Sequence, residues 1–281
     1  MVQQTSDVRV INVTEAPKTN EQSSFIRPKQ SANVLFKFMN KLDYLKDIIK
    51  NKAIMPRYYE EMIDYLNIEG IDKIAYPMSC FCDIHLNKLV YHMENYGYYG
   101  LGLSKDWGIK QGIQPIHYIN TYSELRNDFS DIFNDIFKMP NEERTKHKVY
   151  HDYLLHKLFF MKPIEGKMIT SDGYPHRNFH DEKEWRFIPS FKNVETDLPM
   201  VIDQEQLNPK SYNAYSQGIS QKPELWLKFE FEAIKYIIVN NQDDRKELIE
   251  FIIDHQIGES EYERHTLISK IMVFTELGED W

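Results

Sequence analysis

Apolar residues along the chain alternate between two spacings, and each spacing predicts a different element. Residues 34–38 read Val-Leu-Phe-Lys-Phe, a short apolar run that predicts a strand. Helical spacing begins directly afterwards, at Leu42, Leu45, Ile48 and Ile49. We therefore expect the folded part of the chain to open with a strand that leads into a helix.

A second apolar run covers residues 75–84, AYPMSCFCDI, and predicts another strand. The sequence from 86 to 107 then predicts a short helix followed by a strand rich in glycine and tyrosine. Gly97, Gly100 and Gly102 fit a turn and a close approach between backbones, because glycine has no Cβ. The sequence shows no GxGxxG or P-loop pattern here, so it does not indicate a phosphate-binding loop.

A long amphipathic helix is predicted after residue 121. Thr121 and Glu124 have the spacing of a capping box, and Pro140 follows the last apolar position. A second helix is predicted over residues 142–157. The apolar positions of the first helix are Leu125, Phe129, Ile132, Phe133, Ile136 and Phe137. We expect the two helices to form an insertion, residues 121–157, whose apolar faces pack into the core.

The C-terminal part of the chain returns to strand patterns after a long polar stretch. Residues 191–223 predict a loop that contains short elements. Strands are predicted at residues 225–231 and 236–239, and a helix follows at 244–255. Residues 268–274 predict a last strand that closes the sheet.

Together these elements predict a single α+β domain over residues 31–281, with a mixed, mostly antiparallel sheet and flanking helices. Residues 1–30 differ from it, because they are rich in Gln, Ser, Thr, Asn and Lys and show little apolar periodicity. That composition predicts a flexible N-terminal tail, which would order only against a partner or a neighbouring subunit.

Composition and charge exclude some classes of protein. The 281 residues are 42% hydrophobic and 14% aromatic, enough for a packed core, and the formal net charge is −9. This acidity argues against a protein that mainly binds nucleic acid without specificity, although a local basic groove stays open. The sequence contains neither a secretory type of N-terminus nor an apolar run of the roughly 20 residues that span a bilayer. We therefore expect a cytoplasmic protein with no membrane association.

The two cysteines lie close together in the sequence, at Cys80 and Cys82. On one strand they would share a face, which rules out a disulfide framework. His85 and His92 could in principle join them at a metal, but the spacing fits none of the usual zinc patterns. We expect two small buried thiols and no structural metal.

The most unusual segment is FHDEKEWRFIP, residues 179–189, because it places five acidic or basic side chains and a histidine in an apparent strand. If the backbone is extended from residue 182 to 188, Glu182, Glu184 and Arg186 share one face and the aromatic residues share the other. The charged face could simply be solvated. It could also hold a carboxylate pair on a rigid element, as acid/base chemistry or stabilisation of an oxocarbenium ion requires.

Several segments in this order resemble the AbiGi family of abortive-infection, phage-resistance proteins. They are LFKFMNKLDYLKDIIKNKAIMPRYYEE, PMSCFCDIHL, HMENYGYYGLGLSKDWGIKQGIQPIHYI, LFFMKPIEGK and FHDEKEWRFIP. The family commonly carries His at the position of Lys37 and Pro at the position of His85. The resemblance implies a role in phage defence, and family members are described as antitoxins that partner a nucleotidyltransferase-like toxin.

The order of elements is also similar, more distantly, to ADP-ribosyltransferase folds. Such a fold carries a polar nicotinamide-site residue on its first strand, an aromatic middle strand and a catalytic glutamate on a later strand. The similarity would assign these roles to Lys37, to Tyr98 or Tyr99, and to Glu184. Glu182 would complete an ExE pair, and NAD would be the substrate.

The chemistry that this similarity implies is cleavage of the nicotinamide glycosidic bond. Positive charge then develops on the ribose, and a fixed carboxylate such as Glu184 would stabilise it and orient the 2′-hydroxyl. Arg186 would clamp a phosphate or hold Glu184 in place, or it would form a purely structural ion pair. Because Lys37 is a poor replacement for histidine as a neutral hydrogen-bond donor, a related fold without transferase activity is equally open.

Three classes of function follow from these features. The first is an ADP-ribosyltransferase-like effector that uses NAD to modify a nucleic acid or a protein. The second is a non-catalytic antitoxin or sensor that binds a partner toxin or a phage protein. The third is a ribonuclease with acid and base groups at His92, His117, Lys105 and Glu184. The sequence leaves open whether the protein forms a homo-oligomer.

Overall fold

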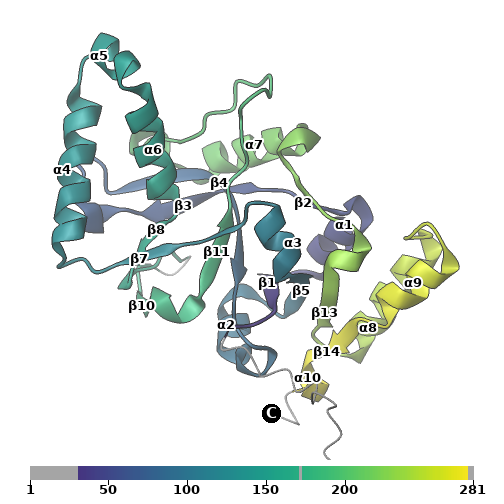
Figure 1. The fold of residues 1–281 in the computed structure, drawn as a ribbon. Coiled ribbons are helices and arrows are strands. Elements are labelled where there is room, and N and C mark those ends of the chain that lie inside the picture. Colours follow the sequence, from purple (N-terminus) through teal and green to yellow (C-terminus); the bar gives the residue numbers. More distant parts are fainter. Residues whose placement is uncertain (1–30, 171–172, 278–281) are drawn as a thin grey trace, which may run out of the picture. The chain divides into compact units, whose positions relative to one another are not determined.

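A mixed, mostly antiparallel β-sheet is the centre of the structure (Figure 1). The structure is a computed structural model, and it describes residues 31–170 and 173–277. The prediction of a flexible tail over residues 1–30 lies outside the described residues. The described residues form one compact unit.

In the described part of the chain the sheet contains eight strands. Seven follow one another in the spatial order β14 (Ile271–Val273), β13 (Ile234–Val239), β5 (Tyr99–Ser104), β1 (Val34–Met39), β4 (Lys73–Cys82), β11 (Glu184–Phe187) and β6 (Gln114–Pro115). The eighth, β3 (Arg57–Met62), pairs with the first part of β4, whereas β11 pairs with its second part. β13 and β14 run parallel and the other neighbours run antiparallel. The predicted fold class, α+β with a mostly antiparallel sheet, is confirmed.

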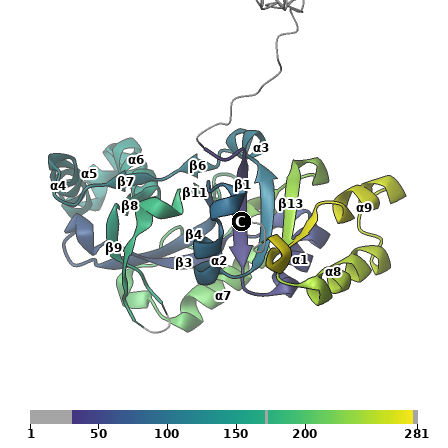
Figure 2. The same cartoon turned by 90° about the horizontal axis from the view of Figure 1, so that it is seen from below.

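Helices flank this sheet, and short strand pairs lie beside it. The helices are α1 (Leu42–Asn51), α2 (Val90–Tyr96), α3 (Lys105–Lys110), α4 (Glu124–Lys138), α5 (Asn141–Lys146), α6 (Lys148–Phe159), α7 (Pro209–Ser220), α8 (Gln242–Asp254), α9 (Glu261–Ile268) and α10 (Phe274–Leu277). The short strands pair as β2 (Ala53–Ile54) with β12 (Leu227–Lys228), β7 (His117–Ile119) with β8 (Met161–Pro163), and β9 (Glu165–Lys167) with β10 (His176–Asn178). Seen from below, α8 and α9 lie at one end of the folded unit and α4, α5 and α6 at the other (Figure 2).

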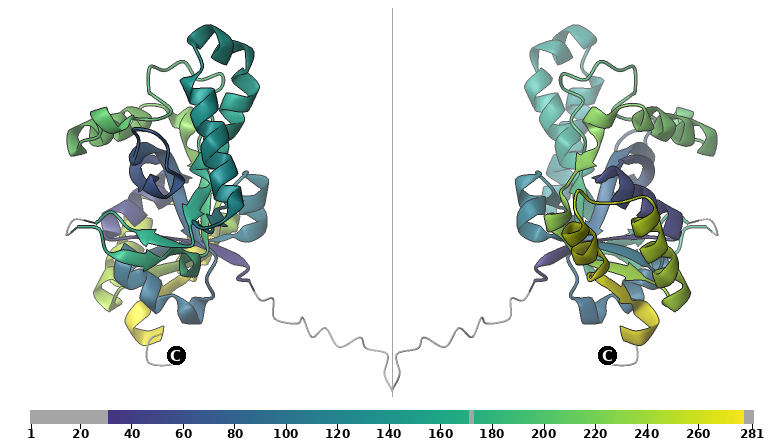
Figure 3. Two further views of the ribbon diagram at one scale, coloured as in Figure 1. Left: turned by 90° about the vertical axis from the view of Figure 1, so that its left-hand side faces the viewer. Right: turned by 90° about the vertical axis from the view of Figure 1, so that its right-hand side faces the viewer.

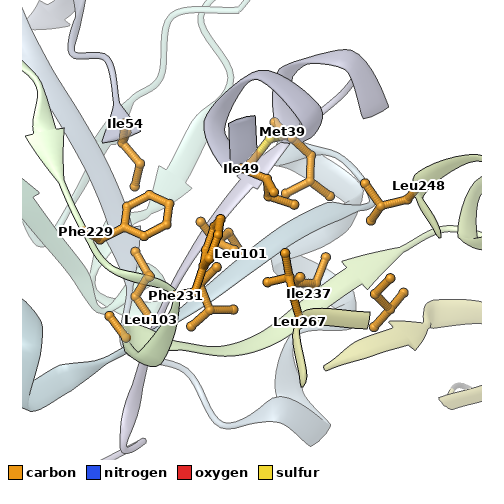
Figure 4. Packing of buried hydrophobic residues seen from close by; sticks show 14 of the residues in the cluster. Met39, Ile49, Ile54, Leu101, Leu103, Phe229, Phe231, Ile237, Leu248 and Leu267 are labelled. Atoms are coloured by element: carbon orange, nitrogen blue, oxygen red, sulfur yellow. The ribbon is translucent and has the colours of Figure 1, made fainter. Parts of the chain in front are cut away.

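The largest apolar cluster covers one face of the sheet at the α8 end (Figure 4). Leu101 and Leu103 of β5 and Ile237 of β13 point into it, because alternate residues of a strand share a face. Helices α1 and α8 close the cluster with Ile49 and Leu248, both fully buried. The predicted opening, a strand followed at once by a helix, is confirmed by β1 and α1.

Helices α4 and α6 lie side by side and α5 joins them, so that the three form a helical hairpin (Figures 1 and 3). Phe129 and Phe133 of α4 pack with Leu154 and Leu158 of α6 in a second buried cluster, which also contains Tyr76 of β4. The predicted core contacts of Phe129 and Phe133 are therefore present, whereas Leu125 and Ile132, which were also expected to pack into the core, are exposed.

Several details of the sequence-based prediction were wrong, including the strand at 225–231, of which only Leu227–Lys228 is extended as β12. The N-cap of α4 is Ser123, not Thr121, because the Ser123 side chain accepts the hydrogen bond from the backbone nitrogen of Arg126. The predicted helix 142–157 is interrupted at His147, between α5 and α6. The polar stretch 191–223 contains the three-turn helix α7, which Asn208 caps through its side chain.

The strand that carries the charged segment is shorter than predicted. Phe179–Glu182 forms a 3₁₀ helix, and Lys183 adopts the left-handed conformation at φ 45°. β11 therefore begins at Glu184, and Glu182 reaches the same region from a turn rather than from the strand. The idea of a solvated charged face was also wrong, because Glu182, Glu184 and Arg186 are all buried.

Candidate functional site

The buried charges of β11 lie beside a cavity of about 250 Å³, which we call the carboxylate cavity. Its wall includes residues of β1, β3, β4, β8 and the turn before β11. Charged side chains on this wall include Lys37, Glu61, Lys162, Glu182 and Glu184. The structure therefore brings Lys37, Glu182 and Glu184, three of the predicted site residues, to one cavity.

Glu184 is held by two cations. Arg186 donates from Nε to Glu184 Oε1 at 2.6 Å and from Nη2 to Oε2 at 3.2 Å, and Lys162 Nζ donates to Oε2 at 3.2 Å. Burial opposes ionisation of this carboxyl, but Arg186 and Lys162 outweigh burial and hold its pKa well below the usual range. Glu184 is therefore an ionised carboxylate whose two oxygens are both occupied by cationic donors.

Arg186 has no donor left for a ligand. Besides its two bonds to Glu184, it donates from Nη1 to the Tyr76 hydroxyl and to the Phe159 carbonyl at 2.8 Å, and from Nη2 to Glu61 at 3.2 Å. These five hydrogen bonds use the five N–H groups of a guanidinium. Arg186 is fully buried, and its contacts with Glu184 and Glu61 are ion pairs within the protein.

Glu182 has a different environment from Glu184. Its Oε1 accepts a hydrogen bond from the Tyr96 hydroxyl at 2.7 Å, while Lys162 and Arg177 lie at 3.7 and 3.9 Å. Burial raises the pKa of Glu182, and Lys162 offsets that rise only in part. The two glutamates therefore differ, because Glu184 is firmly ionised and Glu182 is the easier one to protonate.

Lys162 lies between three carboxylates, from Glu61, Glu182 and Glu184, at 3.9, 3.7 and 3.2 Å. Burial lowers its pKa, but Glu184 and Glu61 outweigh burial, so the pKa of Lys162 is raised. Sequence reasoning missed Lys162, Glu61 and Tyr96. The one signal for these three residues was that each lies in a segment of the family resemblance, Lys162 in LFFMKPIEGK, Glu61 at the end of the first segment and Tyr96 in the segment that begins HMENY.

Lys37 differs from the other cations of the cavity. Within residues 31–170 and 173–277 it forms no ion pair, and its Nζ lies 5.9 Å from the centre of the Phe81 ring. Burial lowers the pKa of Lys37. His92, on the same wall, is also buried enough that its pKa falls to about 4.

The two tyrosines predicted near the nicotinamide line a different space. Tyr98 and Tyr99 border a larger hollow of about 1030 Å³, which Lys37 also borders. The Tyr99 hydroxyl donates to Asp244 at 3.2 Å. Tyr96, which comes from α2 and precedes the turn at Gly97, lines the carboxylate cavity together with Tyr59 and Tyr65.

The ribonuclease residues are not assembled. His92 and Glu184 both line the carboxylate cavity, but His117 and Lys105 are not among its lining residues. Lys105 is instead paired with Asp83 at 2.6 Å. In the part of the chain that the structure describes, no group of three or more His, Cys, Asp or Glu residues could hold a metal ion. Cys82 is buried and Cys80 half-buried, and burial raises both thiol pKa values.

Comparison with known proteins identifies the family. Residues 52–240 match the model of the family described as "Putative abortive phage resistance protein AbiGi, antitoxin". The chain belongs to the AbiGi family. It is 35% identical over 250 residues to the abortive phage resistance protein AbiGi of Lactococcus lactis subsp. cremoris, a match that covers 82% of this chain and 100% of that protein. No solved structure matches the chain.

Membership in the AbiGi family confirms the predicted role in abortive phage resistance. The family match contains Glu61, Lys162, Glu182, Glu184 and Arg186, so the whole buried charge network lies inside it. β1, which carries Lys37, precedes the matched region. Among the described helices, none is both long and apolar enough to cross a membrane.

Proposed function

We propose that this AbiGi-family chain is an antitoxin that acts by binding its toxin, and that the toxin docks on the helical hairpin of α4, α5 and α6. The observation that carries the proposal is the set of large apolar side chains that this hairpin exposes. The description of the family as an antitoxin supports the same function. A protein-binding function requires no free catalytic group.

Both long helices of the hairpin expose apolar residues. On α6 the set is Val149, Tyr150 and Tyr153, with 78, 61 and 62% of each residue accessible. On α4 it is Leu125 and Ile132, which lie seven residues apart and therefore share a face. We call these five residues the hairpin surface. Large apolar and aromatic side chains that stay exposed are typical of protein interfaces.

Charge beside the hairpin surface indicates what kind of partner fits. Four acidic side chains are exposed along α4 at spacings of four, three and four, namely Glu124, Asp128, Asp131 and Asp135. This spacing places them in one stripe of the helix, next to Leu125 and Ile132. A toxin that presents basic side chains around an apolar centre would complement this stripe.

The buried network supports a binding function over catalysis. A catalytic carboxylate must reach the reacting ribose, whereas both oxygens of Glu184 are bound by Arg186 and Lys162. The network instead joins β3, β4, β8 and β11 through side chains of Glu61, Tyr76, Lys162 and Arg186. Its geometry suits a structural role.

Growth of a host that expresses the cognate toxin tests the proposal. Co-expression of the wild-type chain is expected to restore growth. The double variant Tyr150→Ser/Tyr153→Ser is expected to lose protection while folding normally, because both side chains are exposed. The control is Tyr91→Ser/Tyr262→Ser, which removes two tyrosines that are exposed elsewhere, on α2 and α9. Full protection by the hairpin variant would refute docking on this surface.

One observation favours a second candidate, an ADP-ribosyltransferase-like enzyme that uses NAD. Lys37, Glu182 and Glu184 line the same cavity, and the pKa values of the two carboxyls shift in opposite directions, as in many acid/base pairs. Transfer of labelled ADP-ribose from NAD to host lysate, with and without phage, tests this candidate. Labelling by wild type but not by Glu182→Gln would support it. Absence of both labelling and NAD binding in calorimetry would eliminate it.

A further inference from the structure

The larger hollow, of about 1030 Å³, is bordered by cations that form no ion pair with any residue that the structure describes. Lys37 and Arg57 both border it, and both are half-buried. Throughout residues 31–170 and 173–277, neither side chain forms an ion pair with a carboxylate. The other cations near the sheet centre do form such pairs, Lys105 at 2.6 Å and Lys162 at 3.2 Å.

Electrostatics indicate that this arrangement favours an added anion. Burial lowers the pKa of Lys37, and the nearby charge of Arg57 lowers it further, although Cys80 acts in the opposite direction. Two uncompensated cations at one wall repel each other, and an anionic group placed between them would relieve that repulsion. The acidic residues of the hollow, Asp47 and Glu94, are more exposed than the two cations.

Aromatic and amide side chains form much of the remaining wall of the hollow. Tyr44, Tyr59 and Tyr98 border it with 41, 42 and 36% of each residue accessible. Asn213 and Asn240 also border it, and their amides can donate and accept hydrogen bonds. Planar rings stack on such aromatic faces.

We propose that this hollow binds a small molecule that combines an anionic phosphate with a planar ring, the chemistry of a nucleotide. Lys37 and Arg57 bind the phosphate, for which arginine offers two parallel donors and lysine a compact charge. The tyrosines contact the ring, and the hollow is large enough for a ligand of this size, since small-molecule sites typically have about 300–1,000 Å³. The site does not depend on the hairpin surface or on the glutamates of the carboxylate cavity.

Isothermal titration calorimetry with three probes tests the proposal: adenosine 5′-monophosphate, adenosine and inorganic phosphate. Adenosine monophosphate is expected to bind with a Kd below about 1 mM, and adenosine and phosphate alone at least about tenfold more weakly. In the variant Lys37→Met/Arg57→Gln the affinity for the nucleotide should fall at least about tenfold. The control Lys88→Met/Lys110→Met removes the same formal charge from exposed positions and should leave the affinity within about twofold.

Two results would overturn the proposal. One is no binding of the nucleotide to wild type at millimolar concentration. The other is equal affinity in wild type and in Lys37→Met/Arg57→Gln. If circular dichroism shows that the double variant does not fold, the single variant Arg57→Gln replaces it, because Arg57 is only half-buried. The nucleotide should then raise the melting temperature of wild type more than that of Arg57→Gln.

Discussion

At the scale of single residues, Arg186 determines what the neighbouring carboxylates can do. It is fully buried and donates five hydrogen bonds, two of them to Glu184. A buried cation with such partners fixes Glu184 as an ionised structural group. Glu182 accepts a hydrogen bond from a tyrosine hydroxyl and lies farther from its cations, so it is protonated more easily than Glu184.

Removing the charge of Glu184 should strongly destabilise the fold. In Glu184→Gln the buried charges of Arg186 and Lys162 lose their shared partner, and loss of one member of a buried pair costs about 3–5 kcal/mol. Urea unfolding monitored by tryptophan fluorescence measures this cost. The control Glu230→Gln breaks an exposed pair with Lys52 and should cost at most about 1 kcal/mol. Equal stability of the two variants would contradict the structural role of Glu184.

His92 should make stability depend on pH. Burial lowers its pKa from 6.5 to about 4, so the unfolded state binds a proton more readily than the folded state between these values. The free energy of unfolding is therefore unaffected by His92 above about pH 6.5, where the side chain is neutral in both states. It decreases as the pH falls toward 4, and the decrease is about 2 kcal/mol at pH 5. Urea unfolding at about pH 7.5 and 5 measures the loss.

Two variants isolate this contribution. His92→Gln should lose less stability than wild type between the two pH values, because the titrating group is gone. His265→Gln removes an exposed histidine of α9 and should keep the pH dependence of wild type. If His92→Gln and wild type lose the same amount, the pH dependence comes from other groups.

At the scale of elements, the turn from α2 to β5 is closely packed. Gly97 has φ 103°, and a Cβ at this position would lie 2.2 Å from the Met39 carbonyl oxygen. Gly97→Ala should therefore cost more than about 2 kcal/mol, since both the backbone conformation and the contact resist it. At the control position, Gly112, φ is also positive at 75° but a Cβ meets nothing within 4 Å.

The two alanine variants can be compared directly in thermal unfolding. Gly112→Ala should cost only about 1 kcal/mol, from the left-handed backbone alone. A loss for Gly97→Ala no larger than that for Gly112→Ala would mean that the contact with Met39 relaxes. The close backbone approach predicted from the sequence at this glycine would then carry little energy.

Local patterns predicted the elements far better than they predicted the site. The spacing of apolar residues within short stretches of sequence was enough to predict β1, α1 and the helices of the hairpin. The charge network could not be predicted in the same way, because Glu61 meets Arg186 from 125 residues away. Only the pairing of β3 and β11 with β4 brings them together. Spacing also could not show that Lys183 adopts a left-handed conformation and shortens the strand.

At the scale of the whole molecule, the acidic stripe of α4 should govern how fast a toxin associates. In Asp128→Lys/Asp131→Lys the stripe loses two negative charges and gains two positive ones, both at exposed positions. A basic toxin should then associate at least about tenfold more slowly at low salt, with a smaller difference at high salt. Stopped-flow fluorescence measures these rates. Association rates that equal those of wild type at low salt would exclude steering by this stripe.

The central claim is that this AbiGi-family chain binds its toxin through the hairpin surface. The most direct test is the affinity of the purified chain for the purified cognate toxin, measured by calorimetry. We predict tight binding by wild type and by Tyr91→Ser/Tyr262→Ser, and at least about tenfold weaker binding by Tyr150→Ser/Tyr153→Ser. Equal affinity of all three proteins, or no binding by wild type, would contradict the claim.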